Sequence, residues 1–269
     1  MLRSMYSGVS GMKGFQTKLD VIGNNIANVN TTGFKSSRVM FKDILSQTSS
    51  GASAPDATTT AGQNAKQVGL GVSVSSIDTM HLPGSAMTTN NPTDLRINGD
   101  GFFLVKMNDA QEVPYLTRAG DFHVDANRNL VTSDGFFVGD AGGDPITLAD
   151  NVTSFSISQD GTIVQQLDDG TVDNGTQIGL ARVTNPEGLE KIGGSLYRTT
   201  VNSNIDAIEP GVANADGLGA IIAGQLEMSN VDLTGEFTEM IVAQRGFQAN
   251  SRIITTSDEV LQEVVNLKR

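Results

Sequence analysis

Cysteine and tryptophan are absent from this sequence of 269 residues, and aromatic residues make up only 5% of it. Without cysteine, the chain can form neither disulfides nor thiolate metal sites. Few aromatic residues together with 30 glycines are typical of a β-rich protein with many turns, and not of an enzyme with a large packed core. The remaining features of the sequence must therefore distinguish a structural role from a binding role.

Long apolar runs are also missing. No stretch of about 18 apolar residues occurs, so we expect no segment that inserts into a membrane. The N-terminal stretch MLRSMYSGVSGMKGF lacks the apolar core of a secretory signal peptide. The sequence thus predicts a cytosolic protein or one that is exported without a cleaved signal.

Charge is unevenly distributed along the chain, whose net charge is −12. The N-terminal part is basic, the C-terminal part is mildly acidic, and the middle is strongly acidic. Such a surface argues against nucleic acid as a partner, because the phosphate backbone requires clustered Lys and Arg. The opposite charges of the two ends favour their pairing.

The residues that carry enzyme and metal chemistry do not assemble into motifs. His81 and His123 are far apart and form no ligand pair. The stretch GDG at residues 99–101 lacks the further glycine of a phosphate loop, and the acidic residues at 168–173 lack the spacing of a calcium loop. No serine lies in a GxSxG elbow. We therefore expect no enzyme activity, no metal and no cofactor.

The C-terminal segment predicts a long helix, from about residue 231 to 267. Alternate steps of four and three positions give a seam of large apolar residues, interrupted by Gln244, Ser251 and Asp258: Leu233, Phe237, Met240, Phe247, Ile254, Leu261 and Val265. Ser229 or Asn230 is expected to cap the start, and Lys268 and Arg269 suit the dipole at the end. Burying seven such side chains cannot offset the backbone entropy of a helix this long, so the seam requires partners.

The N-terminal segment predicts a second helix, over about residues 4–27. It has the same spacing of apolar residues: Met12, Phe15, Leu19, Ile22, Ile26 and Val29. Its glycines weaken it but permit close approach of another helix. The two ends are expected to pair as an antiparallel coiled coil. The alternative is two ordinary core helices that pack on a sheet.

The middle of the chain predicts an antiparallel β domain. Residues 34–47 indicate an extended connector that ends in a short helix, and residues 49–67 indicate a flexible polar loop. From residue 68 the apolar period becomes two, with tight turns between short strands. The predicted class is α+β, with three parts. These are a helical inner domain at 1–30 and 229–269, a connector and loop at 31–67, and a β-rich outer domain at 68–228.

Both ends resemble a known family. Residues 19–35, LDVIGNNIANVNTTGFK, and residues 229–267 resemble the N- and C-terminal signatures of the flagellar rod and hook protein family of bacteria. DLRINGDGFFLV at 94–105 and YLTRAGDFHVDANRNLVTSDG at 115–135 resemble the family's β domain. The residues that carry the terminal signatures include Asn24, Asn25, Ala27, Asn28, Gly33, Phe34, Gln244 and Arg245.

The resemblance implies a structural subunit that forms a helical homopolymer through the two terminal seams, with the helices lining a channel. The terminal motifs are more similar to those of hook proteins, which implies the flagellar hook, a flexible joint that transmits torque from rod to filament. The distal rod is the alternative, because this chain lacks room for the extra domain of many hook proteins. The implied partners are the distal rod protein, the hook cap, the hook–filament junction proteins and the type III export apparatus. The implied location is the extracellular part of the flagellum. A secreted adhesin or binding module is the competing class.

Overall fold

The computed structural model describes residues 2–54, 62–108, 111, 113–205, 208–215 and 217–267. The chain forms two compact units. Unit 1 contains Met1–Ala27, Ser37–Thr79 and Asp232–Arg269, and unit 2 contains Asn28–Ser36 and Met80–Val231. This division differs from the boundaries expected from the sequence, because residues 37–79 associate with the helices.

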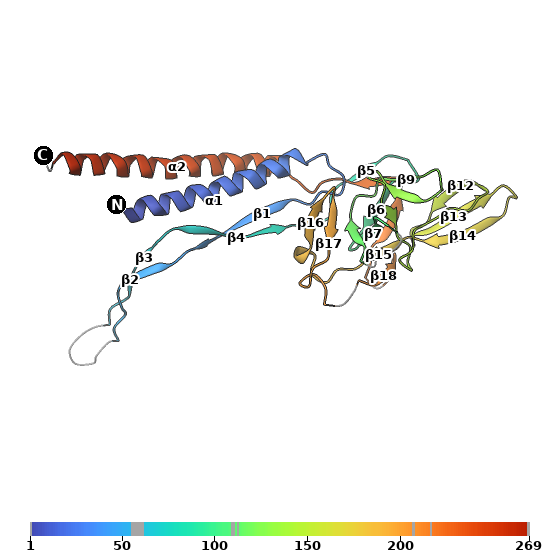
Figure 1. Ribbon diagram of the computed structural model, residues 1–269, viewed down its shortest axis with the longest axis horizontal. Coiled ribbons are helices and arrows are strands. Elements are labelled where there is room, and N and C mark those ends of the chain that lie inside the picture. The colour runs from blue at the N-terminus through green and yellow to red at the C-terminus, as the bar shows by residue number, and fades with distance from the viewer. Residues whose placement is uncertain are drawn as a thin grey trace. The chain divides into compact units, whose positions relative to one another are not determined.

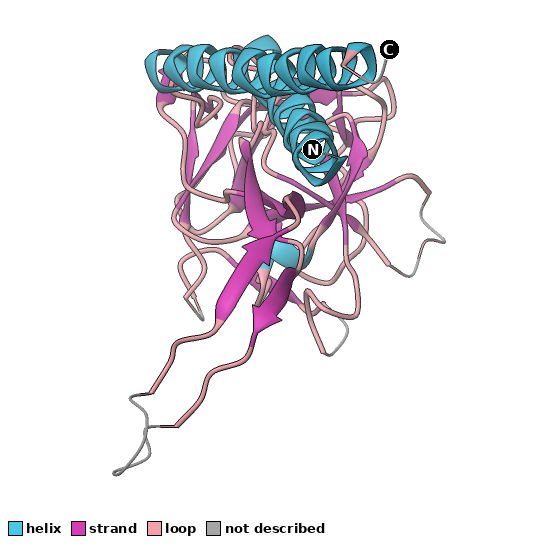
Figure 2. Ribbon diagram, turned by 90° about the vertical axis from the view of Figure 1, so that its left-hand side faces the viewer, coloured by secondary structure: helices cyan, strands magenta, loops and turns pink. Residues whose placement is uncertain are grey.

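Unit 1 consists of two long helices and a two-stranded ribbon. Its elements are α1 (Leu2–Ala27), β1 (Ser37–Asp43), β2 (Ser46–Ser50), β3 (Lys66–Gly69), β4 (Val72–Thr79) and α2 (Leu233–Asn266). The helices are antiparallel, and α1 lies between α2 and the ribbon (Figures 1 and 2). Both predicted helices are confirmed, as is their pairing.

The ribbon is continuous over most of its length. β1 pairs with β4 and β2 with β3, all antiparallel, and Ile44 N and Leu70 N donate hydrogen bonds that join the two pairs. The short helix predicted within 34–47 is therefore wrong, because backbone pairing with the returning strand satisfies this segment instead. Part of the predicted flexible loop, residues 55–61, lies outside the described residues.

Asp232 caps the start of α2. Its Oδ1 accepts a hydrogen bond of 3.0 Å from the backbone N–H of Thr234. The prediction of Ser229 or Asn230 as the cap is wrong, because the helix starts later than expected and Asn230 is used elsewhere. Lys268 and Arg269, expected at the other end, lie outside the described residues.

Unit 2 is built from short antiparallel strands, which confirms the predicted all-β domain. They are β5 (Ala86–Thr88), β6 (Leu95–Asn98), β7 (Phe102–Lys106), β8 (Tyr115–Thr117), β9 (Phe122–Val124), β10 (Leu130–Thr132), β11 (Phe137–Val138), β12 (Val152–Ile157), β13 (Thr162–Leu167), β14 (Val172–Gln177), β15 (Gly179–Ala181), β16 (Glu190–Gly193), β17 (Leu196–Arg198), β18 (Pro210–Val212), β19 (Ala220–Ala223) and β20 (Gln225–Glu227). A short 3₁₀ helix, η1 (Pro186–Gly188), precedes β16. The largest sheet centres on β7, which pairs with β8, β11 and β15.

The main hydrophobic core lies in unit 2, on both sides of β7. Phe103 points to one side, where its ring meets Phe122 edge-on at 5.1 Å between centroids. Phe102 points to the other, against Tyr197 at 5.9 Å. Alternate residues of one strand thus supply two cores, as the period of a strand requires.

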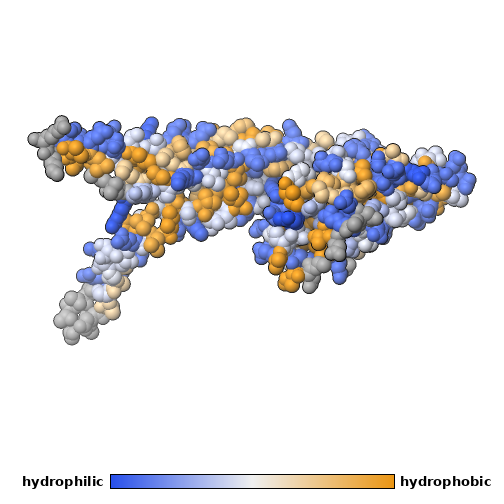
Figure 3. Space-filling model, viewed as in Figure 1, coloured by the Kyte–Doolittle hydropathy of each residue, from blue (hydrophilic) through white to orange (hydrophobic). Residues whose placement is uncertain are grey.

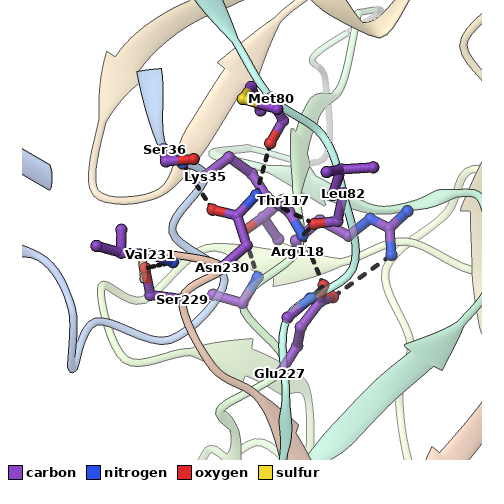
Figure 4. A network of polar contacts seen from close by, with 12 residues as sticks. Lys35, Ser36, Met80, Leu82, Thr117, Arg118, Glu227, Ser229, Asn230 and Val231 are labelled. Atoms are coloured by element: carbon purple, nitrogen blue, oxygen red, sulfur yellow. Dashed lines mark hydrogen bonds and ion pairs between the residues drawn. The ribbon is translucent and has the colours of Figure 1, made fainter. Parts of the chain in front are cut away.

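A buried ion-pair network joins the chain segments at which unit 2 begins and ends (Figure 4). Lys35 and Glu227, both fully buried and remote in sequence, pair at 2.6 Å between Nζ and Oε1. Arg118 approaches the other carboxylate oxygen at 3.4 Å. Lys35 Nζ also donates to the carbonyl of Leu82, and Gly84 N donates to Glu227. One carboxylate therefore organises three segments of chain.

Asn230 extends this network with its side-chain amide. Its Oδ1 accepts from Ser36 N at 2.8 Å, and its Nδ2 donates to the carbonyl of Met80 at 2.8 Å. Met80 N in turn donates to the carbonyl of Ser36. The side-chain amide thus makes the hydrogen bonds that the backbone of a neighbouring strand would otherwise make. These bonds hold the last residues of unit 2 before α2.

Burial and neighbouring charges shift the pKa values of the network residues in opposite directions. Burial lowers the pKa of Lys35 and of Arg118, and the carboxylate of Glu227 opposes both changes. Burial alone would raise the pKa of Glu227, but Lys35 and Arg118 hold it below its ordinary value. The glutamate is therefore ionised, and removing its charge leaves two buried cations without a counter-ion.

Replacing Glu227 by Gln should lower the free energy of unfolding by about 3 kcal/mol, because it isolates Lys35 and Arg118. Urea unfolding of the full chain measures this. Glu190→Gln is the matched control, since its pair with Arg198 is more than half exposed and its loss should leave the free energy of unfolding close to that of the unchanged chain. Equal effects of the two variants would contradict the role of the network.

His81 lies beside the network, between the rings of Phe102 and Tyr197 at 5.6 and 5.3 Å. Its ring nitrogens are shielded from solvent and have no well-oriented hydrogen-bond partner among the described residues. Burial, with smaller contributions from Lys35, Lys191 and Arg118, lowers the pKa of His81 to about 4. The carbonyl of Pro186 opposes this only weakly.

Acid should therefore destabilise unit 2 through His81. Between pH 6.5 and about 4 the unfolded chain binds a proton at His81 and the folded chain does not, so the free energy of unfolding decreases as the pH is lowered, by about 3 kcal/mol. His81→Phe should remove this slope in urea midpoints measured across the range. His123→Gln, at an exposed position on β9, is the control that should retain it.

Candidate assembly surface

The contact between α1 and α2 depends on small residues. A Cβ atom added at Gly11 would lie 2.7 Å from Nδ2 of Asn250, and one added at Gly246 would lie 2.6 Å from the ring of Phe15. A Cβ atom added at Gly8 would lie 3.4 Å from Cγ1 of Ile254, which is an ordinary van der Waals contact. These contacts run in opposite directions along the two helices, so the pairing is antiparallel. Glycine lets the two backbones approach at these points, which explains glycines that otherwise weaken α1.

Asn25 connects all three layers of unit 1. It is buried, and its Nδ2 donates to the carbonyl of Ser37 at 2.8 Å, while its Oδ1 accepts from Ser37 N at 3.0 Å. The same Nδ2 donates to Oε1 of Glu236 at 3.0 Å. The side chain therefore holds the first residue of β1 and the first turns of α2 against α1.

Charged groups surround this junction on α2. Burial raises the pKa of Glu236, the hydrogen bond from Asn25 opposes that change, and the nearby carboxylates of Glu239 and Asp232 add to it. Lys18 of α1 pairs with Glu239. The start of α2 is thus tied to α1 by polar contacts, whereas its middle is tied by close packing.

The predicted α1 seam mostly faces its neighbours within unit 1. Ile22 is buried, and Met12, Phe15, Leu19 and Ile26 are buried or half-buried. The ring of Phe15 also meets Phe41 of β1 at 5.9 Å. Val29 is the exception, because it follows the end of α1 and belongs to unit 2.

The predicted α2 seam faces α1 only in part. Met240, Ile254 and Leu261 are half-buried, and Ile254 lies against Gly8 of α1, but the other four members are exposed: Leu233, Phe237, Phe247 and Val265. Small or polar residues with the same heptad spacing also line the contact, namely Glu236, Ala243, Asn250 and Ser257 with Gly246 beside them. A pattern of large apolar residues does not identify these positions, because close approach of two helices requires small residues.

Two rows of exposed apolar side chains flank the line of contact with α1. The first flank consists of Leu233, Phe237, Ile241 and Phe247, which are 36–54% exposed. The second flank consists of Val242, Ile253, Val260 and Val264, which are 44–54% exposed. The helical repeat places the four members of each flank on one side of α2. Apolar residues lie open along the helices of unit 1 (Figure 3).

So much exposed apolar surface marks an interaction site. Monomeric proteins rarely expose contiguous apolar patches of more than a few hundred Å². Val265 extends the first flank toward the end of α2, and Ile44, Leu45 and Val68 on the ribbon are also exposed. The arrangement can bind apolar partners, and α1 occupies only the strip between the two flanks.

The residues of the terminal signatures have separate locations. Asn24 and Ala27 are exposed on α1, and Gln244 and Arg245 are exposed on α2. Asn28, Gly33 and Phe34 lie in the segment of unit 2 that follows α1, where Lys191 Nζ lies 4.9 Å from the centre of the Phe34 ring. Gly33 has φ of +66°, and a Cβ there would lie 2.5 Å from Ala119 N, so only glycine fits. Lys35 belongs to the same signature, but the sequence pattern does not identify it as a buried ion, because its partner Glu227 is remote in sequence.

The described residues offer few groups of side chains that could bind a metal ion. Among the described residues, no cluster of three or more His, Asp or Glu side chains could hold a metal ion. No helix in the described part of the chain is long and apolar enough to cross a membrane.

Three family models match the chain. A flagella basal body rod protein model matches residues 5–35, a flagellar hook protein FlgE/F/G D1 domain model matches residues 96–165, and a flagellar basal body rod FlgEFG protein C-terminal model matches residues 222–267. In the order of the chain, they cover most of α1, the strands of unit 2 from β7 to β12, and α2.

Curated relatives match over the whole length. The flagellar basal-body rod protein FlgG of Bacillus subtilis is 55% identical over 271 residues, covering 100% of both chains. The FlgG protein of Borreliella burgdorferi is 38% identical with the same coverage. The flagellar hook protein FlgE of Borreliella burgdorferi is 30% identical over an alignment of 448 residues, also with full coverage of both. This chain therefore belongs to the flagellar rod and hook protein family, whose members are structural subunits of the bacterial flagellum.

Proposed function

We propose that this protein is a subunit of the flagellar rod, the alternative that the sequence left open, and not of the hook. The alignment with rod relatives supports this, since it spans 271 residues at 55% identity. Alignments with hook relatives extend to 448 and 469 residues at 30% and 28% identity, so those proteins carry insertions that this chain lacks. The terminal motifs had favoured the hook because they are shared across the family. The rod proposal does not include the flexible-joint mechanism that was expected for a hook subunit.

The two flanks of α2 support polymerisation of the chain with copies of itself. They lie on opposite sides of the strip that α1 covers, so one neighbour cannot cover both. A contact between different patches on identical subunits is heterologous, and it continues into a filament when the rotation does not close. The predicted role of Leu233, Phe237, Phe247 and Val265 in assembly fits their exposure, and it stays a prediction.

The remaining partners are part of the same proposal. The rod would adjoin other axial proteins, and the export apparatus would deliver the chain to the flagellum. The hook cap and the hook–filament junction proteins were expected with the hook interpretation, and the rod proposal does not require them. Catalysis has no place in it, and the subunit acts by bearing load.

Deleting the gene in its host should give basal bodies whose rod is truncated and which carry no hook, as imaged by electron microscopy. The physical reason is that each axial segment is the template for the next. Expression of the intact gene from a plasmid should restore the full structure. Complete rods that merely lack a hook would overturn the rod assignment.

Replacing Phe247 by Asp should lower the yield of polymer about tenfold and retain the helix content of the subunit, because the side chain lies on the first flank and is 36% exposed. Sedimentation measures polymer, and circular dichroism measures helix content. Thr238→Asp, at an exposed position of the same helix, is the control and should polymerise normally. Normal polymers from the Phe247 variant would exclude the first flank from assembly.

A further inference from the structure

A cleft in unit 2 opens beside the buried ion-pair network. Its volume is about 770 Å³, which is the size of a pocket that holds a small organic molecule. Residues 100–102 line one part of it, and residues between β15 and η1 line another. His81 and Arg118 also line the cleft. The proposed assembly through α2 gives this cleft no role.

Arg118 belongs both to the network and to the cleft. Its side chain is only 5% exposed, and its Nη1 lies 3.4 Å from Oε2 of Glu227. The other terminal nitrogen of the guanidinium points away from this carboxylate (Figure 4). Nε is shielded from solvent and has no hydrogen-bond partner among the described residues. The guanidinium therefore retains donors that Glu227 does not use.

The network leaves positive charge beside the cleft. Lys35 and Arg118 are both cations, and Glu227 is the carboxylate that both contact, so two positive charges face one negative charge. The carboxylate of Asp100 also acts on Arg118, but it is exposed, so water weakens its effect. An anion in the cleft would balance the remaining charge.

His81 reports the same positive potential. The charged neighbours that contribute to its lowered pKa are Lys35, Lys191 and Arg118, all of them cations. The whole chain has a net charge of −12, so this sign is local and does not follow from composition. Because Arg118 and Lys35 are buried, solvent screens their charge less than it screens surface charge.

The other walls of the cleft restrict the kind of anion. Phe102, Val183 and Pro186 give it an apolar part. Asp100 and Glu209, both exposed, also line it and would repel a second negative charge. A guanidinium matches the planar geometry of a carboxylate. The cleft therefore suits one carboxylate on an apolar body better than a doubly charged phosphate.

We propose that this cleft is a binding site for a singly charged carboxylate that carries an apolar group. The carboxylate lies against the guanidinium of Arg118, with Arg182 at the exposed edge of the cleft, and the apolar group contacts Val183 and Pro186. A free small molecule and the carboxyl terminus of a peptide that ends in an apolar residue both offer this chemistry. The inference goes beyond the proposed function and does not rest on it.

Isothermal titration calorimetry of the full-length chain with benzoate tests the site. Benzoate has one carboxylate on an apolar ring and should bind. Benzamide, which has the same shape and no charge, and inorganic phosphate should each bind at least about tenfold more weakly. No binding of benzoate, equal binding of benzamide, or tighter binding of phosphate would each overturn the proposal.

Two substitutions locate the binding. Arg118→Lys keeps a charge beside Glu227 but removes the guanidinium, and it should weaken benzoate about tenfold. Arg182→Gln, at an exposed position, should weaken it about threefold. Arg128→Gln is the matched control, because Arg128 is an exposed member of unit 2 that pairs with Asp150 and does not line the cleft, and it should bind normally.

Circular dichroism establishes that each variant is folded. If Arg118→Lys does not fold, Arg182→Gln decides the question, and unchanged affinity in that variant would overturn the proposal. The tripeptide Ala-Ala-Phe distinguishes the two sources of the carboxylate. Tighter binding of the tripeptide than of benzoate assigns the site to a peptide terminus, and weaker binding assigns it to a small molecule. The tripeptide with an amidated terminus should bind at least about tenfold more weakly than the free acid, and equal binding would exclude a carboxylate site.

Discussion

The structure depends on the mismatch between α2 and the one helix that covers it. α2 has 34 residues and carries exposed apolar side chains on both sides of the strip that α1 covers, whereas α1 has 26 residues and occupies only that strip. Glycines narrow that strip further by bringing the two backbones close together. The apolar rows that remain open on α2 are not covered by α1, and the proposed assembly depends on them.

Much of this arrangement could be predicted from the sequence. The helical period of the apolar residues located both helices to within one turn, and the period of two located the strands of unit 2. The face of α2 that meets α1 was predicted only in part, because Ala243, Gly246 and Ser257 give no hydrophobic signal although they lie on that face. β2 was missed because its residues Ser46–Ser50 are polar and exposed, and its strand form depends on pairing with β3.

The buried network could not be predicted for a different reason. Lys35 and Glu227 lie near opposite ends of the chain, and no local pattern connects them. Only the fold brings the two segments together. The same holds for Asn25 and Asn230, whose side chains bind the two residues joined by the peptide bond between Ser36 and Ser37. Asn25 binds Ser37 within unit 1, and Asn230 binds Ser36 within unit 2. The boundary between the units is therefore sharp, because each neighbouring residue is held by its own unit.

The chain passes between the two units four times, after Ala27, Ser36, Thr79 and Val231. A single covalent link would behave as a swivel, because rotation about its backbone dihedrals is easy. Four links cannot all rotate freely, and twisting one unit against the other must bend or stretch several backbone segments at once. The constraint then lies in the backbone itself, and it does not depend on salt or pH as side-chain contacts do.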